Sequence, residues 1–220
     1  MPSQRPKRRD AIQTRAALLA AAGEIFARQG YRNSNLREIC QAAGVNLGAV
    51  SHYFGSKEAL YREVLIMADR QLLGGEALPE LSRGQDPQVA LRNWVGFMLR
   101  FMLVRRPAHP HAGRLMAWEL QDPTPALKEL VNQVMLPVRR SLESIIGAIL
   151  ADADKPKLRG QCVDIILGMS VFHELAHEVL DLFGHPVPRA ESQVNHLTDA
   201  ITEFALGGIR RLAESSRAAS

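Results

Sequence analysis

The stretch 46–57 holds residue types that are well suited to molecular recognition. It begins with the small residues Gly48 and Ala49, so its backbone can approach another molecule closely. Hydroxyl and imidazole groups follow, and such groups exchange hydrogen bonds with nucleic-acid base edges and phosphates. These polar side chains are Ser51, His52 and Tyr53. The stretch therefore favours contact with a duplex.

Lys57 lies directly after a glycine and a serine that can begin a new helix. In the first turn of a helix several backbone N–H groups have no intrahelical acceptor, and the helix dipole favours an anion. We therefore expect the Lys57 ammonium and these N–H groups to hold the same phosphate.

A second pattern, His173-Glu174-Leu175-Ala176-His177, matches the zinc-binding sequence HExxH. On one continuous helix this spacing puts two imidazoles on the same face, as zinc peptidases require. A catalytic zinc also needs a third ligand. His185 has the wrong spacing for one, and Glu191 or Glu203 could serve only if the chain folded back. We expect no enzyme, no catalytic or metal residue and no cofactor.

Two other interpretations of this pattern stay open. In the first, His173 and His177 contact a metal without catalysis, or contact an effector. In the second, which we favour, the two imidazoles pack in a helix–helix interface and form hydrogen bonds across it.

Helical periodicity dominates the chain and no alternating run predicts a strand, so the expected fold class is all-α. A first helix is expected over 10–29 and ends at Gly30. A second is expected over 35–43, with Asn35 as its N-cap and Glu38 reaching back as in a capping box. The next two helices are expected over 47–54 and 57–73.

The two short helices have the layout of a helix-turn-helix. Gly44 lies between them and can adopt the left-handed conformation that a tight turn often uses. Their apolar residues are expected to pack against the first helix, which leaves the polar face of 47–54 for a major groove. The inward-facing residues are Leu36, Ile39, Cys40, Val45, Val50 and Phe54, packed against Leu19, Ala22 and Phe26.

Proline and glycine residues divide the rest of the chain into long helical segments. These are expected over 87–105, 124–151, 159–183 and 190–213. The sequence therefore predicts three parts. They are a basic flexible arm over 1–9, a helix-turn-helix domain over 10–62 and a helical domain over 63–215.

Length and composition limit the classes of protein. The 220 residues are 46% apolar and 23% charged, which indicates a globular chain. The two cysteines have no paired spacing, and the longest apolar run, 16–22, is too short to span a membrane. We expect a cytoplasmic protein without membrane contact.

Charge is distributed unevenly along the chain. Residues 1–62 carry ten Lys and Arg against four Asp and Glu, a net charge of +6, whereas the remainder carries 17 against 19. A basic first quarter indicates a polyanion partner, with double-stranded DNA as the leading candidate.

Several runs within the first 62 residues form a family pattern. They are Thr14-Arg15, Gly30-Tyr31, Leu36-Arg37-Glu38-Ile39, Ala43-Gly44-Val45 and the run from His52 to Leu60. The pattern resembles the DNA-binding domain of TetR-type (AcrR-like) transcriptional regulators. A weaker likeness, at Trp118-Glu119-Leu120 and at 123–127, is similar to the CecR-like subgroup of that family.

The resemblance implies a homodimer whose helical C-terminal domain binds a small effector and signals to the DNA-binding domains. The family often carries Tyr at the position of Ser51, so we expect His52 or Tyr53 to make that phosphate contact. The residues expected to contact DNA are Ser34, Asn35, Arg37, Asn46, Leu47, Gly48, Ala49, Ser51, His52, Tyr53 and Lys57.

By the same resemblance, the last two helices pair with their symmetry mates in a four-helix interface. Segment 159–183 carries two apolar stripes, and a second copy would cover one of them. Coverage of both stripes within one protomer is the alternative. The expected interface residues are Ile166, Ser170, His177, Leu180, Val194, Leu197, Ile201, Phe204 and Gly208.

The effector pocket is expected to be soft and aromatic, because all the internal methionines follow the DNA-binding region. The expected lining residues are Trp94, Met98, Phe101, Met102, Trp118, Met135, Phe172 and His173.

The sequence thus predicts a ligand-responsive DNA-binding regulator, and repression is the default because a dimer on promoter DNA excludes polymerase. It binds a pseudo-palindromic site as a homodimer and is released by a small-molecule effector. Two other classes stay open. They are a zinc-dependent hydrolase that uses 173–177 and a helical interaction module that binds no DNA.

Overall fold

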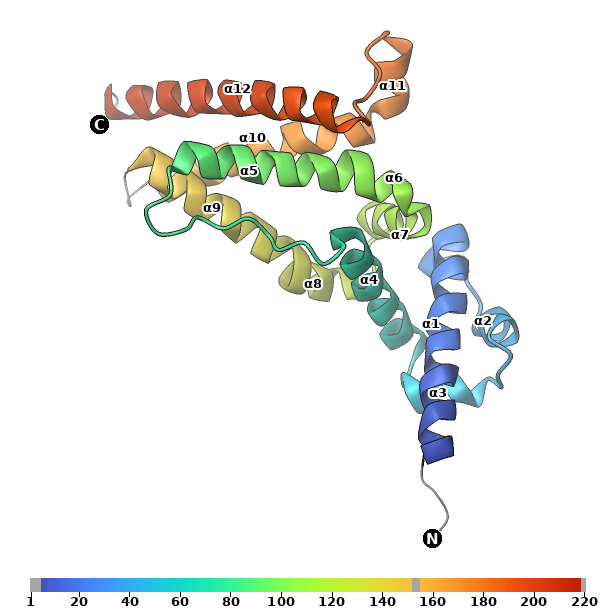
Figure 1. Ribbon diagram of the computed structural model, residues 1–220. Coiled ribbons are helices and arrows are strands. Elements are labelled where there is room, and N and C mark those ends of the chain that lie inside the picture. Colours follow the sequence, from blue (N-terminus) through green and yellow to red (C-terminus); the bar gives the residue numbers. More distant parts are fainter. Residues whose placement is uncertain (1–4, 152–154, 219–220) are drawn as a thin grey trace. The chain divides into compact units, whose positions relative to one another are not determined.

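The computed structural model describes residues 5–151 and 155–218, and within these ranges the regular elements are all helices (Figure 1). The all-α fold class is therefore confirmed. The chain forms two compact units, which are described separately below. Of the described residues, unit 1 contains 5–75 and 109–134, and unit 2 contains 76–108, 135–151 and 155–218.

Unit 1 begins with α1 (Arg5–Asn33), whose helical geometry is interrupted at Gly30 with φ 73° and ψ 174°. The glycine stop is confirmed at the expected residue. The arm expected over 1–9 is already helical from Arg5, and residues 1–4 lie outside the described part of the chain.

The next two helices, α2 (Leu36–Ala42) and α3 (Gly48–Tyr53), form the expected helix-turn-helix. The Asn35 side chain accepts the Arg37 N–H at 2.8 Å and so caps α2. The expected capping box is wrong. Glu38 instead accepts hydrogen bonds from Arg28 and from Gln29 on α1.

The fourth helix, α4 (Lys57–Leu73), has the predicted bounds. Ser56 caps its start by accepting the Ala59 N–H at 3.1 Å, and Gly74 ends it in the left-handed conformation. The core that joins these four helices follows the predicted inward faces. Its fully buried members include Leu18, Ala22, Phe26, Ile39, Val50 and Leu60.

Unit 1 also contains a helix that the sequence analysis did not predict, α7 (Pro110–Gln121), followed by α8 (Ala126–Leu130). Pro110 occupies the first turn of α7, a position that tolerates the missing N–H. Helix α7 packs on α1 and α4, and α8 packs on α4. The compact unit around the helix-turn-helix is therefore larger than the expected domain 10–62.

Unit 2 is a helical bundle whose core lies between its long helices. Fully buried side chains such as Trp94, Leu99, Ile145 and Val163 fill this core. The helices of the unit are α5 (Pro87–Arg100), η1 (Phe101–Arg105), α6 (Arg106–Ala108), α9 (Leu136–Leu150), α10 (Pro156–Leu175), α11 (His177–Leu182) and α12 (Glu191–Ala218). A π-helical segment, η2 (Val131–Met135), leads from α8 into α9.

The segment expected as one helix over 159–183 is two helices. Helix α10 ends at Leu175, and Ala176 has φ −105° and ψ 15°, outside helical geometry. Helix α11 then begins at His177 and projects from the end of α10 (Figure 1).

Candidate nucleic-acid interface

The outer face of α3 presents polar side chains to solvent. Ser51 and His52 are exposed, whereas Val50 points into the core with 1% of its surface accessible. Leu47, just before the helix, is 48% exposed. Helix α3 therefore has a buried apolar side and an exposed polar side.

A shallow hollow lies along this face. Its polar character comes from hydroxyl, amide and imidazole groups, which are suited to base edges and phosphates. Its lining residues are Thr14, Gly44, Val45, Asn46, Gly48, Ala49, His52 and Tyr53. Tyr53 is half-buried, and its ring lies 4.8 Å from the His52 ring in an edge-on arrangement.

The turn between α2 and α3 is held by local hydrogen bonds. Gly44 has φ 68°, and the following residue, Val45, donates its N–H to the Cys40 carbonyl at 2.9 Å. The Asn46 side chain accepts the Ala49 N–H at 3.1 Å. Asn46 therefore uses its Oδ1 to begin α3 and keeps its amide N–H₂ group for another acceptor.

Ser34 does not offer its side chain to DNA. It is 6% exposed, and its hydroxyl donates to the Tyr31 carbonyl at 2.7 Å. Its own carbonyl accepts a hydrogen bond from Lys57 at 2.6 Å. The chain turns inward before Asn35 caps α2, so the Ser34 side chain has little surface for the expected DNA contact. Asn35 and Arg37 are exposed.

Lys57 is half-buried between the start of α4 and the end of α1. Its Nζ lies 4.7 Å from the centre of the Tyr31 ring and donates to the Ser34 carbonyl. Burial lowers the pKa of the Lys57 ammonium from its ordinary value. An ammonium has three N–H donors, so these two contacts orient Lys57 and leave donor capacity for a phosphate.

Arg15 of α1 is, like Arg28 and Arg32 of the same helix, paired with a carboxylate. It pairs with Glu63 on α4, and its guanidinium lies 5.1 Å from the centre of the Phe54 ring. These contacts fasten α1 to the end of α3. Arg15 therefore acts in the packing of the helix-turn-helix.

Helix α7 supplies contacts that the sequence analysis missed. The Tyr61 hydroxyl on α4 donates to Glu119 at 2.9 Å, and the Trp118 indole N–H donates to the Ala27 carbonyl at 3.2 Å. Burial, and then the neighbouring Glu119 carboxyl, raise the pKa of Tyr61, so the hydroxyl keeps its proton and remains a donor. Only the apolar spacing and the N-terminal Pro110 in 110–121 could have signalled this helix.

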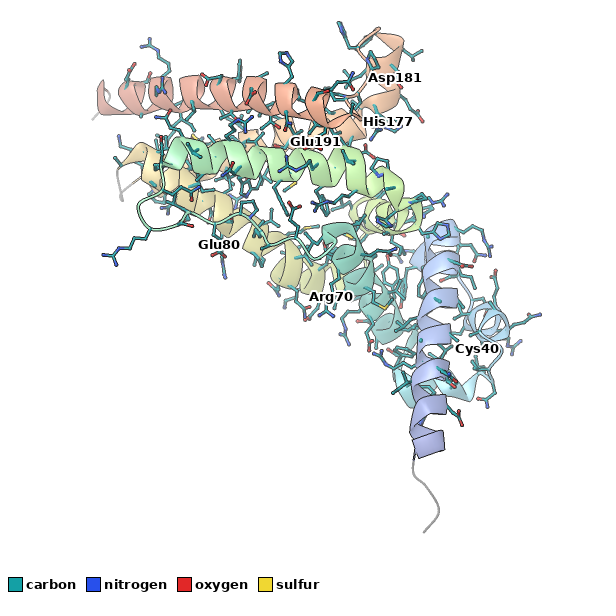
Figure 2. All side chains as sticks on the ribbon, in the orientation of Figure 1. Cys40, Arg70, Glu80, His177, Asp181 and Glu191 are labelled. Atoms are coloured by element: carbon teal, nitrogen blue, oxygen red, sulfur yellow. The ribbon has the colours of Figure 1, made fainter. Side chains whose placement is uncertain are left out.

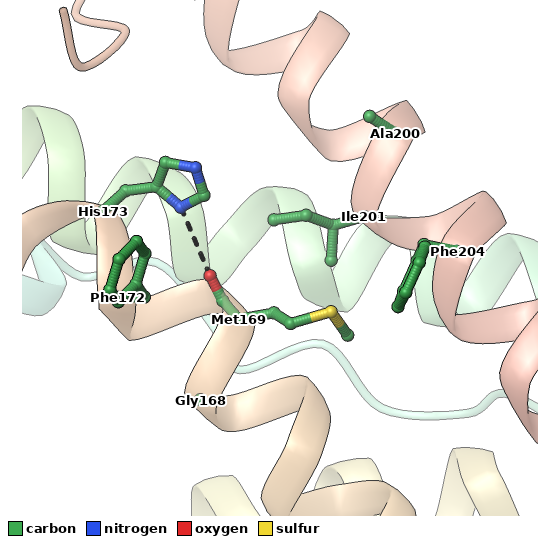
Figure 3. A pocket seen from close by; sticks show the side chains of 7 residues that line it. All are labelled: Gly168, Met169, Phe172, His173, Ala200, Ile201 and Phe204. Carbon is green, nitrogen blue, oxygen red and sulfur yellow. Dashed lines mark hydrogen bonds between the residues drawn. The ribbon is translucent and has the colours of Figure 1, made fainter. Parts of the chain in front are cut away.

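The expected effector-pocket residues do not form one site. Trp118 packs on α1 within unit 1. In unit 2, Trp94 and Met98 are buried in the core, Phe101 and Met102 pack against that core, and Met135 is half-buried. The remaining two, Phe172 and His173, line an open apolar hollow between α10 and α12 (Figure 3).

Several residues of the expected dimer interface are not at the surface of the protomer. Ile166, Ser170 and Val194 are buried inside the protomer, with at most 1% exposed, so they cannot contact a second copy. The apolar stripe of α10 that remains exposed is the one that contains Phe172. On α12, Ile201 is mostly buried while Phe204 is 73% exposed, and Gly208 is exposed. His177, Leu180 and Leu197 are half-buried.

The HExxH pattern does not form a metal site. The helix breaks at Ala176, so the two imidazoles are not on successive turns of one helix. His173 Nδ1 donates to the Met169 carbonyl at 3.3 Å, and His177 Nδ1 donates to the Glu174 carbonyl at 2.9 Å. The expected hydrogen bonds across a helix interface are therefore wrong, because both are local. Within 5–151 and 155–218, no group of three potential ligands gathers.

Glu174, the acidic residue of the HExxH pattern, is paired with an arginine. Its carboxylate lies 3.3 Å from Arg189, which also donates to the Leu103 carbonyl at 2.7 Å. His177 and Asp181 project from α11 (Figure 2). Arg189 therefore ties the segment that follows α11 to Glu174 and to the Leu103 carbonyl.

Known protein families match both halves of the chain. The model of the bacterial regulatory proteins of the tetR family matches residues 18–64. The model of the C-terminal domain of the HTH-type transcriptional dual regulator CecR matches residues 87–209. The chain therefore belongs to the TetR family of DNA-binding transcriptional regulators, which are not enzymes, so the zinc hydrolase interpretation is excluded.

Individual relatives agree with this assignment. The HTH-type transcriptional regulator RutR of Escherichia coli K12 is 32% identical over 198 residues, covering 88% of this chain and 89% of RutR. UidR of the same strain is 33% identical over 64 residues, or 29% of this chain and 33% of UidR.

Solved structures show the same fold. A transcriptional regulator from Rhodococcus sp. Rha1 superposes with a TM-score of 0.60 at 24% identity, covering 88% of this chain and 96% of that one. The TetR family regulator PfmR from Thermus thermophilus superposes with a TM-score of 0.57 at 21% identity, covering 84% and 97%. Across the described residues, no helix is long and apolar enough to span a membrane.

Proposed function

We propose that this protein is a ligand-responsive repressor that binds a pseudo-palindromic DNA site as a homodimer. The observation that carries the proposal is the exposed polar face of α3 around Ser51 and His52, together with the half-buried Lys57 at the start of α4. A short helix fits a major groove when its exposed side has small residues at its start and polar residues along its length.

In this proposal the contacts divide into two kinds. Lys57 and the exposed Arg37 bind phosphates, which adds affinity for every duplex and makes binding depend on salt. The base-reading face provides the sequence preference. Its members are Asn46, Leu47, Gly48, Ala49, Ser51, His52 and Tyr53.

The homodimer is supported by the open hollow on unit 2. Its lining is almost entirely apolar, and Phe172 and Phe204 expose 54% and 73% of their surface there. Large apolar side chains that gather on one face are typical of an interface. A second copy that covers this face would give the two-fold symmetry that matches half-sites about one DNA turn, roughly 34 Å, or a multiple apart.

The effector site is assigned to the core of unit 2 around Trp94. Its indole N–H is buried and has no hydrogen-bond partner among the residues that the structure describes. An unpaired buried donor costs about 1–3 kcal/mol, so an effector that brings an acceptor would be favoured there. The flexible side chains of Met98 and Met102 lie in the same region and can adapt to an apolar body.

Selection of genomic DNA fragments by the purified protein tests this proposal. We expect a recovered motif with two-fold symmetry, and we expect the same protein to be a dimer by light scattering. Release of the selected fragment by added small molecules then tests the effector. A protein that binds no duplex at any salt concentration would instead be a helical interaction module.

A matched pair of variants sharpens the test. Ser51→Ala changes the proposed reading face, and Ser144→Ala changes an exposed serine of α9 in unit 2. Only the first should alter the recovered motif. Equal motifs for both variants and the wild type would contradict the proposed reading face.

A further inference from the structure

The carboxylate of Glu119 is fully buried and has several hydrogen-bond donors around it. It has no accessible surface, although it lies on α7 between exposed residues. Oε2 accepts the Tyr61 hydroxyl at 2.9 Å. Oε1 accepts both the backbone N–H and the hydroxyl of Thr124 at 2.9 Å. A buried carboxylate is costly without such partners, so this network holds Glu119 in one place.

Thr124 in turn fastens the network to the chain that follows α7. Its hydroxyl accepts the Ala126 N–H at 3.1 Å, at the start of α8. Glu119 is therefore fixed by its own helix and by the beginning of the next one. From this fixed point it holds the Tyr61 ring on α4.

The Tyr61 ring is part of an aromatic cluster within unit 1. Its centre lies 4.9 Å from the centre of Phe26 in an edge-on arrangement, and 4.9 Å from the centre of Tyr31. Tyr61 is 1% exposed, so this cluster is a packed core. A shift of the Tyr61 ring would directly change the packing of the Tyr31 ring.

Tyr31 connects the cluster to the proposed DNA-contacting surface. The Lys57 ammonium lies 4.7 Å from the centre of the Tyr31 ring and donates to the Ser34 carbonyl at 2.6 Å. Contacts thus run without a gap from Glu119 through Tyr61 and Tyr31 to Lys57. Each of these residues belongs to unit 1.

The geometry points to Glu119 as a positioning residue for DNA binding, which acts through the Tyr61 and Tyr31 rings to place the Lys57 ammonium for a phosphate contact. This inference rests on the proposed function. It gives α7 a specific role in DNA affinity, although α7 is separated in sequence from the helix-turn-helix by more than 50 residues. Because its effect passes through Lys57, it changes affinity for all duplexes alike.

The test compares Tyr61→Phe with Lys57→Ala in salt titrations of DNA binding. Tyr61→Phe keeps the ring and removes only the hydroxyl that Glu119 holds. We expect roughly tenfold weaker binding, as for the loss of one charge-assisted hydrogen bond. The negative slope of log K against log salt should also become shallower by about 0.9, as in Lys57→Ala.

A combined variant shows whether the effect passes through Lys57. In the Lys57→Ala background, Tyr61→Phe should cause no further loss of DNA affinity. Glu119→Gln should bind nearly as the wild type does, because its amide can accept from Thr124 and donate to the Tyr61 oxygen. Glu119→Leu, which can do neither, should behave as Tyr61→Phe does.

Thr202→Val is the matched control for a merely structural effect. It removes another buried hydroxyl hydrogen bond, from Thr202 to the Thr198 carbonyl at 2.7 Å in unit 2. Thermal unfolding monitored by circular dichroism gives the folded fraction of every variant, and affinities are referred to folded protein. Should Glu119→Leu not fold, Tyr61→Phe and Glu119→Gln alone decide the question.

The outcomes separate the inference from the proposed function. The inference is overturned if Tyr61→Phe binds DNA with the wild-type affinity and salt slope while Lys57→Ala binds more weakly and with a shallower slope. An additive loss in the double variant overturns it as well. If the wild type binds no duplex, the proposed function itself has failed.

Discussion

The indole of Trp118 on α7 lies directly against Gly30, where the helical geometry of α1 is interrupted. A Cβ atom built at Gly30 would come within 3.3 Å of the Trp118 ring, and the Trp118 N–H donates to the Ala27 carbonyl one turn earlier. Gly30 has φ 73° and ψ 174°, a conformation that is essentially restricted to glycine. The end of α1 is thus shaped by both its own backbone and a helix far along the chain.

Gly30→Ala is therefore expected to lower the free energy of unfolding by about 1–3 kcal/mol, through backbone strain and contact with Trp118. Urea denaturation measures this change. Gly23→Ala is the control in the same helix, because its Cβ would meet only Val64 at an ordinary 3.9 Å. There the helix propensity of alanine should raise the free energy of unfolding by up to about 1 kcal/mol. If both variants change the free energy of unfolding in the same direction, the geometry assigned to Gly30 is contradicted.

Ser51→Ala and Lys57→Ala are expected to affect DNA binding in different ways. Loss of a base-reading side chain should relax the preference at one position of each half-site by about 1–3 kcal/mol. Loss of a phosphate contact should weaken binding to all duplexes alike. Binding to a library randomised at single positions measures both effects. If Ser51→Ala weakens binding to all sequences alike, Ser51 contacts the DNA backbone and does not read a base.

Phe204→Glu is expected to separate the proposed dimer. Phe204 is 73% exposed in the protomer, and burial of such a side chain contributes about 1.5–3 kcal/mol. Two-fold symmetry places two copies in the interface, so the dissociation constant should rise more than about a hundredfold. Analytical ultracentrifugation measures this change. Val89→Glu, at an exposed apolar site of α5, is the control and should leave the dimer intact.

Asp69 on α4 is expected to make stability depend on pH. It is 5% exposed, and burial raises its pKa to about 6, partly offset by the neighbouring Arg70. The folded pKa lies above the unfolded value of about 3.9, so the folded state binds the proton more tightly. The resulting stability is fully present below about pH 4 and is lost as the pH rises through 6.

Asp69→Asn removes this loss. At pH 7.5 it should raise the free energy of unfolding by about 2–3 kcal/mol, and near pH 4 the gain should disappear. Urea denaturation at the two pH values measures the difference. Asp122→Asn changes an exposed carboxylate on the same unit and should show no such gain. A gain for Asp69→Asn that is the same at both pH values would contradict the burial of an ionised carboxylate.

The local elements of unit 1 were predictable because their signals act within a few residues. Asn35 and Ser56 cap helices through bonds to N–H groups two and three residues ahead, and Gly74 ends α4 through its own left-handed backbone. The exposure of Ser51 and His52 followed from the spacing of apolar residues in α3. The burial of Ser34 was not predictable in this way, because its surroundings include Lys57, which is 23 residues away and donates to its carbonyl.

The amino-acid sequence by itself indicated the class of protein through its resemblance to a family. It also predicted the helix-turn-helix and several helix ends, since periodicity and capping are properties of short stretches. Tertiary structure alone decided that α7 packs on α1, that Ile166 faces inward while Phe172 faces solvent, and that the chain breaks at Ala176. The physical reason is that two apolar stripes on one helix are equivalent until other helices cover one of them. Which stripe is covered depends on packing between residues that are distant in the chain.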